Sequence, residues 1–88
     1  MEKVAAAIQV KVLFFGRLKE IVSGAEQVID AVEGQSIEHL FSKCVAAHPE
    51  LARYRSSLVA TRNQEFSAWD TVVHAGDEVA FLPPVSGG

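Results

Sequence analysis

The sequence has little cysteine and no long apolar run, and each shortage excludes a class of protein. Cys44 is the only cysteine among 88 residues, so no disulfide can form within the chain, as suits a reducing compartment. The apolar run at residues 4–8 is too short for a signal-peptide core, and no run approaches the ~18–20 residues of a membrane span. We therefore expect a cytoplasmic protein without a membrane partner.

An excess of positive charge is also lacking. Eight lysines and arginines stand against eleven acidic residues, which gives a formal net charge of −3 and disfavours a nucleic-acid partner. What is present is a globular composition, because 49% of the residues are hydrophobic and 22% are charged. A chain of this length supports one domain with a single core.

Residue patterns typical of catalysis or metal binding are absent as well. The three histidines, His39, His48 and His74, are too scattered for a zinc site, and no second cysteine is available. Cys44 falls on the apolar side of a predicted helix, where burial would raise the pKa of its thiol and make it inert. We find no paired-carboxylate pattern and no glycine-rich phosphate loop. The sequence thus argues against an enzyme with its own active site, and no bound cofactor or metal is expected.

The hydrophobic pattern predicts short strands around one main helix. Apolar and polar residues alternate at the start of residues 8–15, which is typical of a strand. Apolar residues recur at helical spacing over residues 37–48, between the N-cap residue Ser36 and Pro49. The other expected elements are a short helix at 17–24 that stops at Gly24, strands at 26–32, 57–62, 65–67 and 78–82, and a loop with a helical turn at 50–57.

This order of elements predicts an α+β fold, in which the main helix covers one face of a mixed sheet of about five strands. We expect an N-terminal extension at residues 1–8, a domain at 9–82 and an extended tail at 83–88. Alternation turns Val79 and Phe81 into the core, together with Val10, Val12 and Phe14. It turns Leu13, Phe15, Ala80 and Leu82 toward the uncovered face, where they would form an apolar patch large enough for a protein partner.

The chain ends in a tail that leaves the last strand through Pro83 and Pro84, which cannot continue a ladder. Residues 85–88 can extend over ~13 Å, and they finish on Gly87 and Gly88. Glycine has no Cβ, so such an end can enter a channel too narrow for other residues and offer its carboxylate to a second enzyme. A frayed terminus without a function is the alternative.

Three stretches closely resemble the small subunit of molybdopterin synthase. They are KVLFFGRLKEIVSG near the start, NQEF in the middle and GDEVAFLPPVSGG at the end. The resemblance spans about residues 9–88 and is poor over 50–57, and Leu82 stands where phenylalanine is more usual. It implies the ubiquitin-like β-grasp fold and the function of a sulfur carrier in molybdenum cofactor biosynthesis.

The resemblance also implies a reaction sequence and its partners. An adenylyltransferase of the ubiquitin-activating type would use ATP to adenylate Gly88, and sulfur would then replace AMP to leave a thiocarboxylate. The tail would enter the large subunit of the synthase and pass sulfur to cyclic pyranopterin monophosphate. Gly87 would be the narrow residue that lets Gly88 reach the active site. Two carriers would serve a dimer of large subunits, so the carrier would be the sulfur-donating subunit of a heterotetramer.

The residues expected to bind these partners are Phe15, Phe66 and Leu82 on the apolar surface, with Pro83, Pro84 and Val85 at the exit of the tail. Of these, Phe15 and Leu82 also follow from the alternation argument. Two other interpretations remain open. One is a carrier for another pathway, such as a thiamine-type sulfur carrier, or a ubiquitin-like protein modifier. The other is a non-catalytic β-grasp interaction module whose tail is inert.

Overall fold

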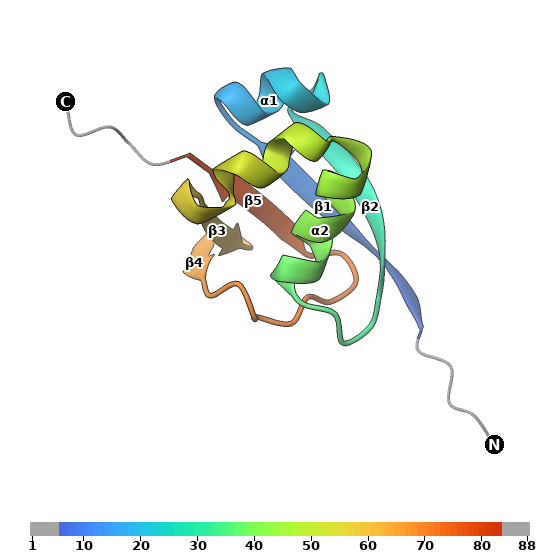
Figure 1. Cartoon of the computed structure of the whole chain (residues 1–88). Helices are drawn as coiled ribbons and strands as arrows, with labels where there is room; N and C mark the ends of the chain where they lie inside the picture. Colours follow the sequence, from blue (N-terminus) through green and yellow to red (C-terminus); the bar gives the residue numbers. More distant parts are fainter. Residues whose placement is uncertain (1–5, 84–88) are drawn as a thin grey trace.

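The computed structural model of the chain describes residues 6–83, and its framework is a five-stranded mixed sheet with strand order β2-β1-β5-β3-β4. Figure 1 shows the sheet with the helices lying across it. The predicted α+β architecture is therefore confirmed. The strands are β1 (Ala7–Phe14), β2 (Glu26–Val32), β3 (Val59–Arg62), β4 (Glu65–Ser67) and β5 (Glu78–Leu82).

The first and last strands lie side by side at the centre of the sheet. β1 and β5 are parallel, with Phe14 opposite Phe81. β1 and β2 are antiparallel. β3 is antiparallel to both β5 and β4. Parallel strands must be joined by a connection that crosses over the sheet. In this chain the connection from β1 to β5 includes the main helix, α2 (Ile37–Ala47). The C-terminal end of β5, where the tail begins, thus lies next to the end of β1.

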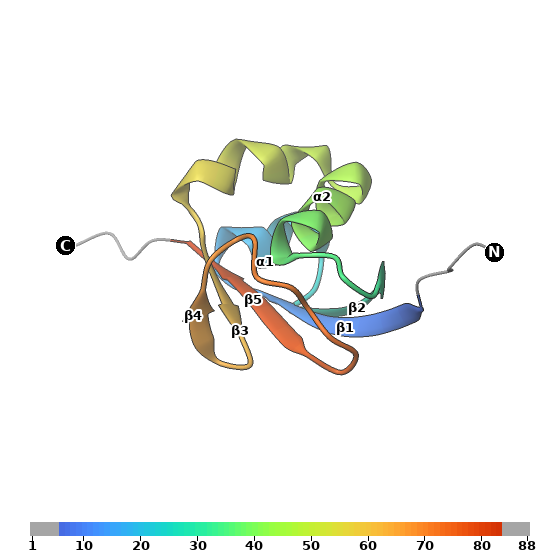
Figure 2. The same ribbon diagram turned by 90° about the horizontal axis from the view of Figure 1, so that it is seen from below.

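The helical segments between residues 6 and 83 all cover the same face of the sheet, as Figure 2 shows. They are α1 (Arg17–Val22), α2 and the 3₁₀-helix η1 (Pro49–Ser57). The residues predicted to face the core from β1 and β5 are buried there, which confirms the alternation argument. Phe81 lies at the centre of this core, with its ring 5.1 Å from that of Phe41 and 5.5 Å from that of Trp69.

The main helix begins at a reciprocal cap. The Ser36 hydroxyl accepts a hydrogen bond from the backbone N–H of His39 at 3.4 Å, and the Ser36 N–H donates to Nδ1 of His39 at 3.0 Å. The N-cap prediction for Ser36 is therefore confirmed. Histidine occupies the position that glutamate or glutamine usually takes in this arrangement.

Two local predictions were wrong. The left-handed residue after α1 is Ser23, with φ of 62°, and the helix ends before it, so Gly24 is not the stop. Residues 50–57, expected as a loop with one helical turn, belong to the nine-residue helix η1. Pro49 starts η1, because proline is well suited to the first helical position. The bounds of two strands also differ from those expected: β1 covers residues 7–14 rather than 8–15, and β3 begins at Val59 rather than at residue 57, which belongs to η1.

The turn between β3 and β4 predicts a stabilising substitution. Asn63 and Gln64 both have positive φ, of 52° and 72°, as a type I′ hairpin turn requires. Glutamine has a Cβ that disfavours this conformation, whereas glycine does not. We expect Gln64→Gly to raise the free energy of unfolding by about 0.5–1 kcal/mol, measured by urea denaturation. Gln64→Ala is the matched control, because it keeps the Cβ and should bring no gain.

Candidate protein-interaction site

The face of the sheet opposite the helices carries a row of side chains that crosses four strands. Leu13 of β1 pairs with Ala80 of β5, Ala80 pairs with Thr61 of β3, and Thr61 pairs with Phe66 of β4. No helix lies on this face in the part of the chain between residues 6 and 83 (Figure 2). We call it the open face.

A second row on the open face lies nearer to the tail. Leu82 of β5 pairs with Val59 of β3, and Phe15 follows the end of β1. Phe15 and Val59 are each 43% exposed, Phe66 is 79% exposed and Leu82 is half-buried. Large apolar groups that remain this exposed, close to one another, are typical of a surface that binds another protein. The structure thus places Phe15, Phe66 and Leu82 on one surface, as the sequence predicts.

One residue expected on this patch contributes little to it, and another was missed. Ala80 does face away from the core, but only 7% of it is exposed, because its small side chain lies between Leu13 and Thr61. Val59 joins the patch through its pairing with Leu82. Ala60 is buried, and successive residues of a strand point to opposite faces, so its neighbour Val59 points to the open face. Applying this alternation to the predicted strand at 57–62 would have assigned Val59 to that face.

The exit of the tail lies against the end of β1. Gly16 has φ of 58°, and a Cβ at this position would lie 3.3 Å from Cγ of Pro83. The turn after Phe15 therefore contacts the point where the chain leaves β5. Of the residues predicted for the tail, Pro84, Val85, Gly87 and Gly88 lie outside the described residues, as do the first five residues of the expected N-terminal extension.

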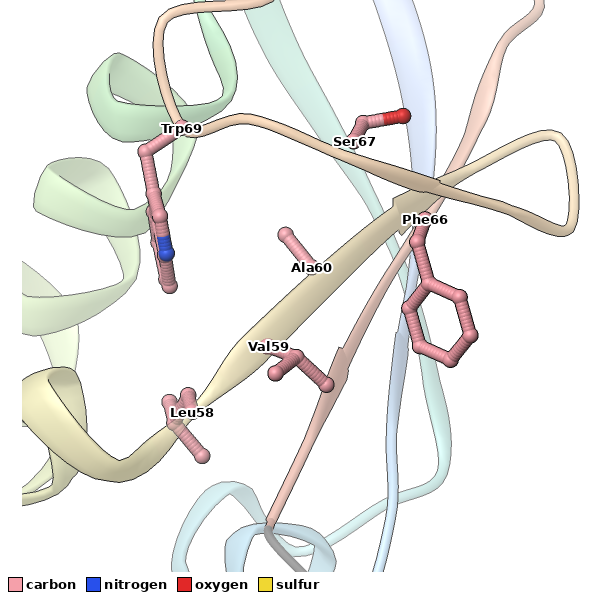
Figure 3. A pocket seen from close by; sticks show the side chains of 6 residues that line it. All are labelled: Leu58, Val59, Ala60, Phe66, Ser67 and Trp69. Atoms are coloured by element: carbon pink, nitrogen blue, oxygen red, sulfur yellow. The ribbon is translucent and has the colours of Figure 1, made fainter.

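An apolar groove of about 460 Å³ lies beside β3 (Figure 3). Figure 3 shows Trp69 on one side of β3 and Phe66 on the other, with Val59 and Ala60 between them. Val59 and Phe66 also belong to the open face, so the groove continues it around the edge of the sheet. The six residues that line the groove are Leu58, Val59, Ala60, Phe66, Ser67 and Trp69.

Trp69 is held in place from two sides. Its ring stacks on that of Phe81 with an interplanar angle of 13°, and the guanidinium of Arg55 lies 3.5 Å from its ring centre. Arg55 is fixed in turn, because its Nε donates to a Glu38 carboxylate oxygen at 3.0 Å. This hydrogen bond lowers the pKa of Glu38. Trp69 is thus an aromatic residue at the rim of the core, and it forms a rigid wall of the groove.

The cysteine and the histidines that the sequence offered as candidates lie among the described residues. Cys44 is buried in the core, as predicted, and burial raises the pKa of its thiol to about 11. Among residues 6–83, no three histidine, cysteine or acidic side chains are placed to hold a metal ion. None of the helices in the same range is long and apolar enough to cross a membrane.

The fold defines the chain as a ubiquitin-like β-grasp protein, and its open face carries exposed apolar side chains. Solved structures agree on the fold: SAMP1 from Haloferax volcanii superposes with a TM-score of 0.80 at 28% identity, covering 91% of this chain and 99% of that one. A protein complex of subunits 1 and 2 of the molybdopterin-converting factor from Helicobacter pylori matches with a TM-score of 0.66 at 24% identity, covering 92% of this chain and 100% of that one.

Sequence comparison gives the family. The model of the ThiS family matches residues 12–88, and the chain belongs to this family. It is 36% identical over 83 residues to the molybdopterin synthase sulfur carrier subunit of Chlamydomonas reinhardtii, covering 92% of this chain and 100% of that protein. The subunit of the same name from Escherichia coli is 37% identical over 81 residues, covering 90% of this chain and 99% of that protein.

Proposed function

We propose that this protein is the sulfur carrier subunit of a molybdopterin synthase and that Gly88 is its reacting residue. The observation that carries the proposal is the position of the open face, where the exposed side chains of Phe15 and Val59 belong to the segments on either side of Leu82, the last residue of β5 before the chain continues to its Gly-Gly end. The similarity to sulfur carrier subunits over nearly the whole chain supports the same assignment.

The chemistry begins with a carboxylate, which is a poor electrophile. A carboxylate oxygen of Gly88 attacks the α-phosphorus of ATP, and pyrophosphate leaves. Hydrosulfide supplied by a donor then attacks the carbonyl carbon, AMP leaves with the original oxygen, and the new S–H group loses its proton. The resulting thiocarboxylate is a nucleophile that stays tethered to the domain, which raises its effective concentration at an acceptor. Both catalysts are partner proteins in this scheme, and ATP is bound by the activating enzyme.

The open face supplies what such a carrier needs from its fold. Phe15, Phe66, Leu82 and Pro83 would contact the large subunit while the tail reaches its active site. The adenylyltransferase would dock on the same surface, so that the two partners bind in turn rather than together. A heterotetramer of two carriers and two large subunits, a cytoplasmic location and cyclic pyranopterin monophosphate as the sulfur acceptor belong to the same proposal.

A second candidate function, protein modification, is favoured by the likeness to the small archaeal modifier protein 1 of Haloferax volcanii, at 26% identity and a TM-score of 0.81. Both functions use the same chemistry until the adenylate of Gly88 has formed. The two functions differ in the group that then attacks the carbonyl, which is a sulfur nucleophile in one case and a lysine amine in the other.

The test is intact-mass analysis after incubation with ATP, the cognate activating enzyme and a sulfur donor. We expect the mass to rise by the difference between one sulfur and one oxygen atom, and the product to transfer sulfur to the pterin substrate in the presence of the large subunit. Covalent adducts with lysine-containing proteins in place of that rise would favour the modifier. An unchanged mass with the cognate enzyme would exclude both carrier chemistries and leave the interaction module.

A further inference from the structure

The groove beside β3 runs along the edge of a strand. Leu58, Val59 and Ala60 are consecutive, and successive side chains of a strand point to opposite faces, so a pocket that touches all three must lie along the strand's edge. β4 covers this edge only as far as the pair between Ala60 and Ser67. Within the described residues, the edge next to Leu58 and Val59 has no strand partner.

After Ser67 the chain turns from the edge toward the core, where Trp69 packs on Phe81. The slot that a longer β4 would fill is therefore open, and apolar side chains form its walls. Its two aromatic walls differ: Trp69 is fixed by Arg55 and Phe81, whereas Phe66 is 79% exposed. A rigid aromatic side chain in a concave apolar site is typical of residues that dominate a protein interface.

We propose that this groove binds an extended apolar segment of the large subunit, which lies along β3 where β4 ends. Such a segment would prolong the outer strand of the sheet and place alternate side chains against Trp69 on one face and against Phe66 on the other. The inference rests on the proposed function, because it takes the large subunit as the partner. It adds a second element to the contact: an edge strand beside the open face.

The choice of occupant follows from the continuity of the two surfaces. Val59 and Phe66 line the groove and also lie on the open face, so a protein that covers the open face reaches the groove without a gap. A second copy of this chain in the groove would compete with that partner for the same two side chains. Binding of the large subunit at both surfaces accounts for the exposure of Phe66.

Trp69 offers a direct readout, because it is the only tryptophan in the chain. Carrier made with 5-fluorotryptophan has a single fluorine resonance, and the tryptophans of the unlabelled large subunit do not contribute to it. We expect this resonance to shift when the cognate large subunit is added, because the segment displaces water from the wall of the groove.

Three variants test the groove, and because Val59 lies on both surfaces, the fluorine shift at saturation rather than the loss of affinity reports on the groove. Val59→Asp should weaken binding of the large subunit about tenfold and abolish the fluorine shift even at saturation. Val72→Asp is the matched control, because Val72 is 41% exposed against 43% for Val59 and does not line the groove, and it should change neither quantity. Phe15→Asp alters the open face alone, so it should weaken binding and keep the full shift at saturation.

Each other outcome overturns the inference. If the large subunit binds and sulfur is transferred while the resonance of the unmodified sequence stays in place, the groove is not part of the contact, although the proposed function stands. If the resonance moves when the carrier alone is concentrated, the occupant is a second copy of the chain. If the large subunit does not bind at all, both the proposed function and the occupant of the groove are wrong.

Discussion

Removal of Gly88 should reduce sulfur transfer to background while the domain stays folded. In the proposed function the terminal carboxylate is the reagent, and a chain that ends at Gly87 places its carboxylate one residue short of the catalytic centre of each partner. One residue of extended chain spans ~3.3–3.6 Å, which is far more than the positioning error that a reacting group tolerates. The measurement is thiocarboxylate formation by intact mass, followed by pterin sulfuration with the large subunit.

The folded state is the internal control of this experiment. The core is built from residues 8–81, so the deletion should leave the urea midpoint unchanged within error. Ser86→Ala is the matched control, because it alters the tail but keeps its length and its Gly-Gly end, and it should still accept sulfur. Full sulfur transfer by the shortened chain would contradict the proposed function and favour an interaction module with an inert tail.

The sequence predicts the strands of this protein well where burial on one face imposes an alternation. β1 and β5 are of this kind: Val12, Phe14, Val79 and Phe81 are all buried, and Phe15 remains exposed on the other side. The apolar side chains on the open face of these strands are predictable for the same reason. Because the side-chain period of a strand is two residues, fixing its buried set also fixes its exposed set.

The groove was not predictable in this way, because it depends on contacts between segments that are distant in the sequence. Trp69 becomes a wall only because Arg55 of η1 and Phe81 of β5 hold its two faces, and η1 itself was expected to be mostly loop. The left-handed Ser23 is a similar case. Local preference favours glycine there, and the tertiary structure places serine in that conformation.

The start of β5 is fixed by Asp77, which accepts three hydrogen bonds. Oδ2 accepts from Nε of Arg62 at 2.8 Å and from the backbone N–H of His74 at 2.8 Å, and Oδ1 accepts from Nδ2 of Asn63 at 3.1 Å. Burial acts to raise the pKa of Asp77, but the hydrogen bonds from His74, Asn63 and Arg62 outweigh it, so the pKa is lowered. The carboxylate thereby ties the hairpin of β3 and β4 to the strand that carries the tail.

Asp77→Asn should be strongly destabilising although it preserves the size of the side chain. All three partners are donors, and asparagine would turn an N–H group of its own toward at least one of them. Only 8% of Asp77 is exposed, so the donors that lose their acceptor have little access to water as a replacement. We expect a loss of about 2–4 kcal/mol in the free energy of unfolding at pH 7, measured by urea denaturation. Asp70→Asn, at an exposed aspartate, should change it by less than about 0.5 kcal/mol.

The pH dependence tests whether the charge of Asp77 is the cause. Its pKa is lower in the folded protein than the unfolded value of about 3.9, so its contribution is fully present above that value and is lost as the pH falls through the folded pKa. The asparagine side chain of the variant does not titrate. The difference in unfolding free energy between the two proteins should therefore be constant from pH 7 to about 5 and shrink below about 4. A difference that stays the same down to the acid limit would assign the stabilisation to packing rather than to the carboxylate.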